Sequence, residues 1–233
     1  MLVYGKNVAR EVLKHKEDVV KHIYITSKFN DKEIIGLISR NKMKSEIKSS
    51  EELERLTVSN HQGIVLDILE YSFYDIDDVY EDDEASFLVI LDHIEDPRNF
   101  GAIIRTCECA GVHYIIIPNK RSVEVNGTVY KASSGAIVNT KIVSVSNLNN
   151  TITKLKAKGF WIIGTDSKGE VYSSLNYKDK TALVIGSEGE GLKELVRRNC
   201  DYIASIPLNG SVNSLNASVA AGIMIYEVVR SRK

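Results

Sequence analysis

The sequence has few of the features that mark extracellular, metal-binding or membrane proteins. Its three cysteines, Cys107, Cys109 and Cys200, form no CxxC pair, and its five histidines show no HExxH or zinc-finger spacing. We therefore expect reduced, structural thiols and no metal. No apolar run approaches the roughly 18 residues needed to cross a bilayer. The first residues also lack the basic-then-apolar pattern of a signal peptide, so we expect a cytoplasmic protein with no membrane contact.

An excess of basic residues, the usual mark of a nucleic-acid partner, is also missing, since the formal net charge is −1. The charge is unevenly distributed, however. Residues 1–70 carry +1, residues 71–87 carry seven acids and no basic residue, and residues 88–233 carry +5. One short acidic segment supplies the whole negative excess, so the remainder of the chain is compatible with an RNA partner.

That acidic segment, "YSFYDIDDVYEDDEAS", is the predicted domain boundary. Its charges repel one another, and no helical or strand period runs through it. We expect a domain at 1–70, a linker at 71–86 and a second domain at 87–233. The alternative is an ordinary surface loop within one domain.

The first domain reads as a small α/β unit. Helices are expected at "GKNVAREVLKH", at "NDKEIIGLISRNK" with Asn30 or Asp31 as cap, and at "SSEELERLTV" with Ser50 as cap. Strands are expected at "HIYIT" and "GIVLDIL". This part contains no evident catalytic cluster, which favours a binding role.

From Phe87 onward, short apolar runs alternate with helical stretches, the pattern of an α/β domain with a parallel sheet covered on both faces. The runs are "FLVILD", "YIIIP", "KIVSV", "FWIIGTD", "ALVIG" and "YIASIPL", and helices are expected near 100–110, 147–158, 190–199 and 215–231. Ligands of such sheets bind beyond the carboxyl ends of the strands, so the loops that follow strands are the places to search.

Two of these loops carry unusual residues. In "LDHIEDPRNFGAIIRTCECAGV", Asn99 can cap a helix, and Arg105 lies on a mainly apolar helix where its charge needs a partner; a surface or ion-paired arginine is the alternative. In "LVIGSEGEGL", three glycines follow a strand, which indicates close backbone approach to a ligand or a plain tight turn. Glu188 and Glu190 would repel phosphate, so an uncharged or cationic ligand suits this turn better.

The third loop, "IPLNGSVNSLNASVAAGI", places six small polar residues before a helix, more than capping requires. The helix that follows is apolar nearly all round. We therefore expect it to be buried against its own sheet or against a second subunit.

Together, "NFGAIIRT", "IGSEGEGL" and "IPLNGSVNSLNASVAAGI" resemble the three signature motifs of the SpoU (TrmH-like) branch of the SPOUT RNA methyltransferases. "YGKNVAREVLK" and "HQGIVLDI" resemble the RNA-binding domain of the RlmB-type members. The resemblance implies a deep trefoil knot, a homodimer, and methyl transfer from S-adenosylmethionine to a ribose 2′-hydroxyl of RNA. For RlmB-type members the expected target is a guanosine of 23S rRNA.

The resemblance also implies site residues. Cofactor contacts fall on Gly186, Ser187, Ile206, Leu208 and Leu215, and catalytic positions on Asn99, Arg105, Glu188, Ser214 and Asn216. A guanidinium is a poor base because it stays charged in proteins, so we expect Arg105 to stabilise the developing alkoxide and a nearby phosphate. Glu188 would orient Arg105, and the two asparagines and the serine would hold the ribose. On the first helix, Lys6, Arg10 and Lys14 are candidate RNA contacts, with a solvated face as the alternative.

Three other functions remain open. The same chemistry on tRNA, or at an antibiotic-resistance site of rRNA, would leave these motifs unchanged. A non-catalytic RNA-binding factor would not need all of the motif residues. A nucleotide-binding oxidoreductase is disfavoured because the chain lacks the GxGxxG fingerprint.

Overall fold

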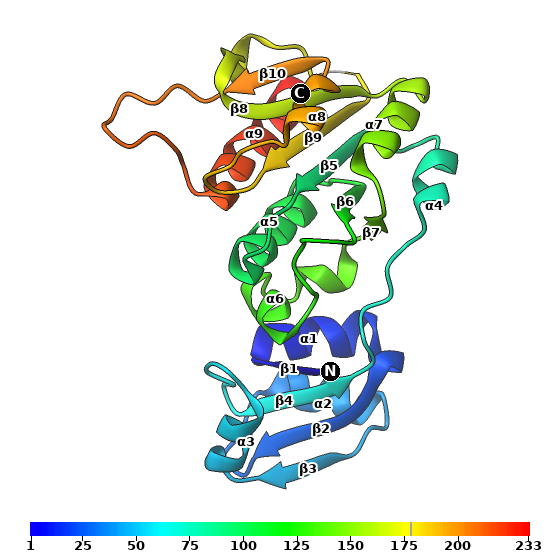
Figure 1. Cartoon of the computed structure of the whole chain (residues 1–233). Coiled ribbons are helices and arrows are strands. Elements are labelled where there is room, and N and C mark those ends of the chain that lie inside the picture. The colour runs from blue at the N-terminus through cyan, green and yellow to red at the C-terminus, as the bar shows by residue number, and fades with distance from the viewer. Residues whose placement is uncertain (178) are drawn as a thin grey trace.

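The computed structural model describes residues 1–177 and 179–233, which form two sheets with helices around them (Figure 1). The N-terminal sheet has the order β1-β4-β2-β3, and β4 runs antiparallel to both of its neighbours while β2 and β3 are parallel. Its elements are β1 (Leu2–Tyr4), α1 (Lys6–His15), β2 (Val20–Thr26), α2 (Lys32–Arg40), β3 (Ser45–Lys48), α3 (Ser50–Leu56) and β4 (Ile64–Ile68). The sequence did not predict β1 or β3.

Side-chain caps fix where the N-terminal helices begin. Asp31 caps α2 by accepting from the Ile34 amide at 3.3 Å. The predicted cap Ser50 is wrong by one residue. Ser49 caps α3 instead, in a reciprocal capping box with Glu52 whose two hydrogen bonds measure 3.2 and 2.8 Å. Both arrangements satisfy amides that a helix start leaves without partners.

The C-terminal sheet has six strands in the order β10-β8-β9-β5-β6-β7, and every neighbouring pair is parallel. The strands are β5 (Phe87–Asp92), β6 (Tyr114–Pro118), β7 (Ile142–Val145), β8 (Trp161–Val171), β9 (Thr181–Gly186) and β10 (Tyr202–Ser205). The helices are α4 (Ile76–Glu81), α5 (Pro97–Cys109), α6 (Gly127–Ala132), α7 (Leu148–Ala157), α8 (Glu194–Arg198) and α9 (Ala217–Ser231). Short 3₁₀ helices occupy Glu17–Val19, Ala136–Asn139 and Tyr172–Ser174. The predicted fold class, a parallel-sheet α/β domain after a small α/β domain, is confirmed.

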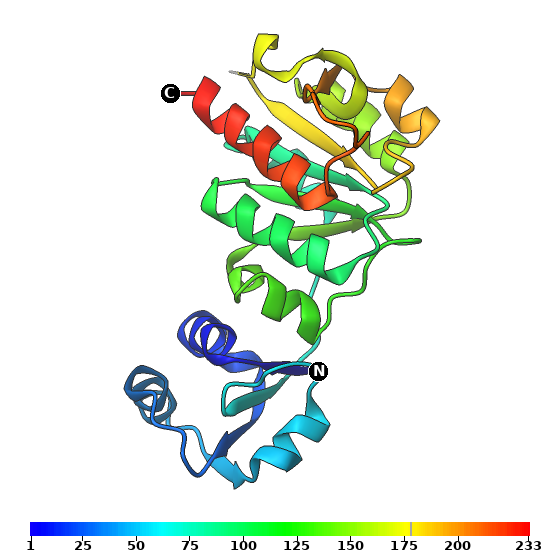
Figure 2. The same cartoon turned by 90° about the vertical axis from the view of Figure 1, so that its left-hand side faces the viewer.

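Successive residues of β5 face opposite sides of this sheet, as the period of a strand requires. Phe87, Val89 and Leu91 join the apolar cluster that holds α5, α6 and α9. Leu88 and Ile90 join the cluster that holds α4, α7 and α8. Figure 2 shows α9, α5 and α6 stacked in a column along the first face, with α1 beneath them.

The acidic stretch is more ordered than its sequence indicated. It contains helix α4, whose Val79 is buried. Tyr71 donates its hydroxyl hydrogen to the Thr140 carbonyl at 2.8 Å and accepts from the Ile142 amide at 3.1 Å. Tyr74 pairs with Val143 of the edge strand β7. The stretch therefore lies along the last strand of the sheet and contains a short helix that the sequence did not predict.

The two parts of the chain are in direct contact through α6, β1 and α1 (Figure 1). The apolar cluster on the α5 face extends from one part into the other. A Cβ atom on Gly127 would lie 2.5 Å from the Leu2 carbonyl oxygen, so only glycine permits this approach. Glu11 of α1 also accepts a hydrogen bond from Asn139 at 3.2 Å.

Helix α9 is buried on one face only within this chain. Met224, Ile225 and Val228 are buried, whereas Val219 and Tyr226 are 50% and 51% exposed. The exposed positions share one face because seven residues span about two helical turns. Within the parts of the chain that the structure describes, no helix is long and apolar enough to cross a membrane.

Candidate functional site

The middle of β8 and the loops that follow β9 and β10 line a cavity of about 330 Å³, hereafter the first cavity. All five residues predicted to bind cofactor line it: Gly186, Ser187, Ile206, Leu208 and Leu215. The predicted catalytic residues Glu188 and Ser214 line it as well. Their roles stay predictions, but the structure does bring these residues to one place.

The first cavity has a wall that the sequence did not predict. Strand β8 pairs with β10 at Ile163 and Gly164 and again at Glu170 and Val171. Residues 165–169, between these two stretches, leave the ladder and place Thr165, Asp166 and Ser167 at the cavity. The signal was present in "GTDSKG", a cluster of turn-forming residues after an apolar run.

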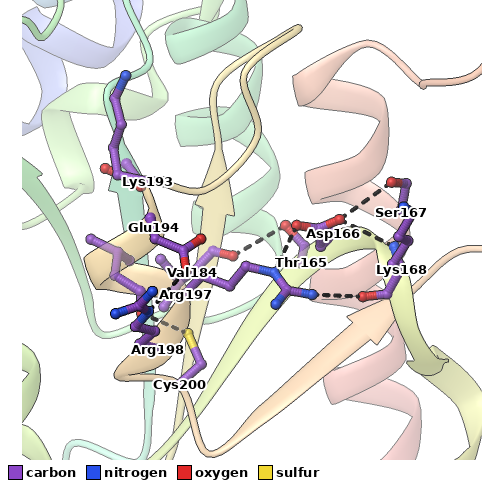
Figure 3. A network of polar contacts seen from close by, with 12 residues as sticks. Thr165, Asp166, Ser167, Lys168, Val184, Lys193, Glu194, Arg197, Arg198 and Cys200 are labelled. Carbon is purple, nitrogen blue, oxygen red and sulfur yellow. Dashed lines mark hydrogen bonds and ion pairs between the residues drawn. The ribbon is translucent and has the colours of Figure 1, made fainter.

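Helix α8 braces this wall (Figure 3). The Arg197 guanidinium donates to an Asp166 carboxylate oxygen at 3.2 Å and to the Lys168 carbonyl oxygen at 3.2 Å. Thr165 donates to the Val184 carbonyl at 3.1 Å, which ties the wall to β9. Burial alone would raise the pKa of Asp166, but hydrogen bonds from the Lys168 amide and Arg197 outweigh it and hold this pKa below its ordinary value. The carboxylate that forms the brace is therefore charged at neutral pH.

Gly186 at the end of β9 allows the backbone to fold closely over itself. A Cβ atom there would lie 2.3 Å from the Gly191 carbonyl carbon. Ser187 and Gly191 exchange backbone hydrogen bonds of 3.2 and 3.0 Å, which close the glycine turn beside the cavity. Gly191 has a φ of 66°, a left-handed value that favours glycine.

The three motifs meet in a cluster of Asn99, Glu188 and Asn216. The Asn216 amide nitrogen donates to Asn99 Oδ1 at 3.0 Å and lies 3.3 Å from Glu188 Oε2, and Asn99 Nδ2 donates to the same oxygen at 3.4 Å. Asn216 also caps α9 by accepting from the Ser218 amide at 3.0 Å. One side chain thus positions both the helix and the cluster.

A second cavity of about 390 Å³ adjoins the first, and the two share Ser187, Glu188, Glu190 and Ala217. Asn99 also lines the second cavity, so the amide–carboxylate cluster stands where the two cavities meet. The sequence did not single out two further lining residues, His93 and Arg121.

Buried Asp92 fixes the loops around the second cavity. Its carboxylate lies 2.5 Å from His93 Nδ1 and accepts from the Lys193 amide at 2.7 Å. The Lys193 side chain pairs with Glu190 and, as the largest cause, lowers the pKa of that carboxyl. These contacts hold the loop after β5 against the loop after β9.

Arg105 lies apart from the cluster. Its guanidinium donates to the Ser134 hydroxyl at 3.2 Å, and it lines neither cavity. The predicted partnership with Glu188 does not occur within the described chain, where Glu188 accepts from Asn99 and Asn216. Four of the five predicted catalytic residues therefore gather around the cavities, and Arg105 does not.

The candidate RNA contacts on α1 differ in their availability. Lys6 lines a cavity of about 610 Å³ in the N-terminal part and lies 3.5 Å from Asp31. Arg10 forms a 2.6 Å ion pair with Glu33. Lys14 is exposed. Only part of this helix face therefore offers free positive charge.

Comparison with protein families assigns both parts of the chain. Residues 2–74 match the family described as RNA 2′-O ribose methyltransferase substrate binding. Residues 86–226 match the SpoU rRNA methylase family.

Individual proteins agree with this assignment. A Bacillus subtilis (strain 168) protein named as a TrmH family tRNA/rRNA methyltransferase, YacO, is 38% identical over 99% of this chain and 95% of its own length. A Staphylococcus aureus protein named for the same family is 45% identical over 77% of this chain and 75% of its own. The SpoU methyltransferase AviRb from Streptomyces viridochromogenes superposes with a TM-score of 0.83 at 27% identity, over 100% of this chain and 89% of that one. With these matches and three motifs converging on one site, the chain belongs to the SpoU, or TrmH, family of RNA 2′-O-ribose methyltransferases.

Proposed function

We propose that this enzyme methylates the ribose 2′-hydroxyl of a guanosine in 23S rRNA, with S-adenosylmethionine as the methyl donor. The observation that carries the proposal is the cluster of Asn99, Glu188 and Asn216 at the junction of two cavities. A methyl transferase must bring two substrates together at one point, and this arrangement offers a separate space for each.

The first cavity suits S-adenosylmethionine. The apolar residues Ile206, Leu208 and Leu215 line it, and Gly186 lets the backbone of the 187–191 turn approach closely. Glu188 supplies negative charge, which favours a sulfonium cation over a phosphate-bearing nucleotide. AviRb, a relative of the same fold, has been solved in complex with AdoMet. When bound, this cofactor supplies a methyl group on a positively charged sulfur.

The chain's own residues then serve to align the ribose and stabilise negative charge. The sulfonium needs no acid to leave, so the difficult step is the loss of the 2′-hydroxyl proton. The Asn99 and Asn216 amides and the Ser214 hydroxyl would hold the ribose, and the Glu188 carboxylate orients both amides. Arg105 would stabilise the developing alkoxide, a role that requires it to reach a site it does not line within its own chain.

A homodimer would meet that requirement. Val219 and Tyr226 expose an apolar face of α9, and the 206–216 segment extends away from the sheet with Leu208 and Val212 exposed (Figure 1). An uncovered apolar surface of this kind is typical of a subunit interface. We infer that two copies pack through α9 and this segment, which would contain the crossing of a trefoil knot. Sedimentation should show a dimer that Val219→Glu converts to monomer, whereas Val58→Glu, at an exposed site in the N-terminal part, should leave it intact.

We assign RNA binding to residues 1–70, the linker to 71–86 and catalysis to 87–233, in keeping with the two family matches. The N-terminal domain supports rRNA rather than tRNA as substrate, because the resemblance is to RlmB-type enzymes. The curated relatives are named for both RNAs, so the experiment must separate them.

The experiment measures transfer of labelled methyl from S-adenosylmethionine to unmodified 23S rRNA and, separately, to unmodified total tRNA. The position is mapped by the resistance of a 2′-O-methylated linkage to alkali. Labelling of one 23S guanosine is expected, and an Asn216→Asp variant should lose it. Labelling of tRNA alone would refute the proposed substrate. If the protein binds the cofactor but transfers methyl to neither RNA, both the proposed substrate and the proposed reaction are refuted.

A further inference from the structure

Arg121 lies in a loop whose position is fixed from three sides. The loop follows β6 and leads to α6. The Asn119 amide donates to the Val145 carbonyl at 2.9 Å, and the Val123 amide donates to the Ile94 carbonyl at 3.1 Å. At its far end, Asn126 caps α6 by accepting from the Thr128 amide at 3.0 Å. The Arg121 side chain therefore starts from a defined point at the second cavity.

Two features of Arg121 are unusual for a merely solvated arginine. Its backbone has a φ of 52°, a left-handed value that is rare outside glycine and asparagine. Strained backbone of this kind concentrates at functional sites. Its guanidinium also forms no ion pair or hydrogen bond among the described residues, although four acids line the same cavity.

Those acids are mostly occupied by other donors. Glu190 pairs with Lys193, Asp96 accepts from the first amides of α5, and Glu188 accepts from the two asparagines of the cluster. Glu95 is exposed to solvent. The charge of Arg121 helps to lower the pKa of Glu190, yet within the described residues Arg121 forms no ion pair or hydrogen bond with that carboxylate. Its five N–H donors can therefore bind an anion from outside.

The second cavity carries groups of both signs of charge. Asn99 and Glu188 present acceptors for ribose or base donors, and Lys193 is already paired with Glu190. Arg121 is the cation on this lining that is left to attract a phosphate against the nearby acids. In RNA, a ribose 2′-hydroxyl lies next to the 3′-phosphodiester, so a site for that hydroxyl needs an anion acceptor nearby. Arg105, the arginine expected from the motif, lines neither cavity within its own chain.

We propose that Arg121 binds the RNA backbone phosphate adjacent to the target ribose and thereby places the 2′-hydroxyl at the Asn99–Glu188–Asn216 cluster. The proposal rests on the proposed function, because it assumes that the second cavity takes the RNA. A planar guanidinium can grip a phosphate with two parallel hydrogen bonds, which fixes orientation as well as position.

The test compares Arg121→Gln and Arg121→Lys with Lys158→Gln. Lys158 is an exposed lysine just before β8, at the amino-terminal ends of the strands and thus at the end of the sheet opposite the cavities. Its replacement removes the same charge far from the proposed site. Arg121→Gly is added because it removes the guanidinium and the backbone strain together, which separates loss of function from loss of stability. Each variant is assayed for affinity for S-adenosylmethionine, for methyl transfer to the 23S rRNA and tRNA transcripts, and for the salt dependence of binding to both transcripts.

Arg121→Gln and Arg121→Gly are expected to lower kcat/KM for RNA about 10- to 100-fold, the effect of one charge-assisted contact, and to leave cofactor affinity within about twofold. Arg121→Lys should retain part of the activity, and Lys158→Gln all of it. The slope of log K against log salt should fall by about 0.7 to 0.9 in Arg121→Gln, as one phosphate contact is lost.

An unchanged kcat/KM and an unchanged salt slope in Arg121→Gln would overturn the proposal. So would a fall in cofactor affinity, which would place Arg121 in the first cavity. Failure of the wild type to methylate either RNA refutes the proposed function instead, and the salt slope of RNA binding still decides for or against Arg121.

Discussion

Replacing Gly186 by alanine tests whether close backbone packing builds the first cavity. The new Cβ would lie 2.3 Å from the Gly191 carbonyl carbon and 2.6 Å from the Leu192 nitrogen. Both neighbours are backbone atoms, so no side chain can rotate away to make room. The turn at 187–191 must move, and its two hydrogen bonds of 3.2 and 3.0 Å would be lost or lengthened.

The cost follows from these contacts. Two backbone hydrogen bonds contribute about 2 kcal/mol together, and overpacking adds at least about 1 kcal/mol. A free-energy loss of about 3 kcal/mol should lower the melting temperature of a chain of this length by about 6–12 °C. Cofactor affinity should fall as well, because the displaced turn lines the cavity.

Gly210→Ala is the matched control. Gly210 lies in the loop after β10, between lining residues of the same cavity, and a Cβ there meets nothing within 4 Å. We expect an unchanged or slightly raised melting temperature, since alanine reduces the freedom of the unfolded chain. Calorimetric melting and titration with S-adenosylmethionine measure both variants. Equal melting temperatures for Gly186→Ala and Gly210→Ala would refute the packing argument.

Three further predictions use other contacts. Asn216→Asp should melt within about 2 °C of the wild type, because aspartate also caps helices, yet methyl transfer should fall at least tenfold because the second carboxylate oxygen faces Glu188. Asn216→Ala should lose methyl transfer and also about 1 kcal/mol of stability, because the helix cap is removed. Because the pKa of Asp166 is lowered in the folded protein, its contact with Arg197 contributes stability above about pH 4, and this stability is lost as the pH falls through the lowered pKa. The melting temperatures of the wild type and Asp166→Asn should therefore differ at pH 7 and converge at lower pH. Gly127→Ala should loosen the contact of α6 with Leu2, so hydrogen exchange in β1 and α6 should be faster while cofactor affinity is unchanged. Exchange rates equal to those of the wild type would contradict this prediction.

Long apolar runs were the most predictable part of the fold. "FLVILD" and "YIIIP" coincide with β5 and β6, because strands buried on both faces are continuously apolar. The strands and the helix that the sequence did not predict are short or polar. Strand β3 is "SEIK", with little burial, and β1 has three residues that depend on distant β4 for their partner. Helix α4 is acidic and obtains its order from contacts with β7 and Tyr114 rather than from its own pattern.

The candidate site also contains residues that the sequence predicts and residues that only the structure reveals. Motif residues such as Gly186 and Asn216 could be identified by their order along the chain. The turn-forming residues of "GTDSKG" mark a break in the apolar run. That Thr165 and Asp166 reach the first cavity depends on how β8 leaves and rejoins its ladder with β10, a pairing between distant segments. Arg121 forms no ion pair or hydrogen bond among the described residues although acids line the same cavity, and this property is visible only in three dimensions.

The contact between the acidic stretch and β7 also bears on solubility. A parallel sheet ends in two strands with unpaired backbone groups, and such edges recruit other chains into aggregates. At one edge, Tyr74 pairs with Val143 and the Tyr71 hydroxyl accepts from the Ile142 amide. The same segment, residues 71–87, carries seven acids and no basic residue, and this like charge would repel a second copy that approaches in the same orientation. We therefore expect that removing the Tyr71 and Tyr74 contacts would leave this edge open to pairing with other chains.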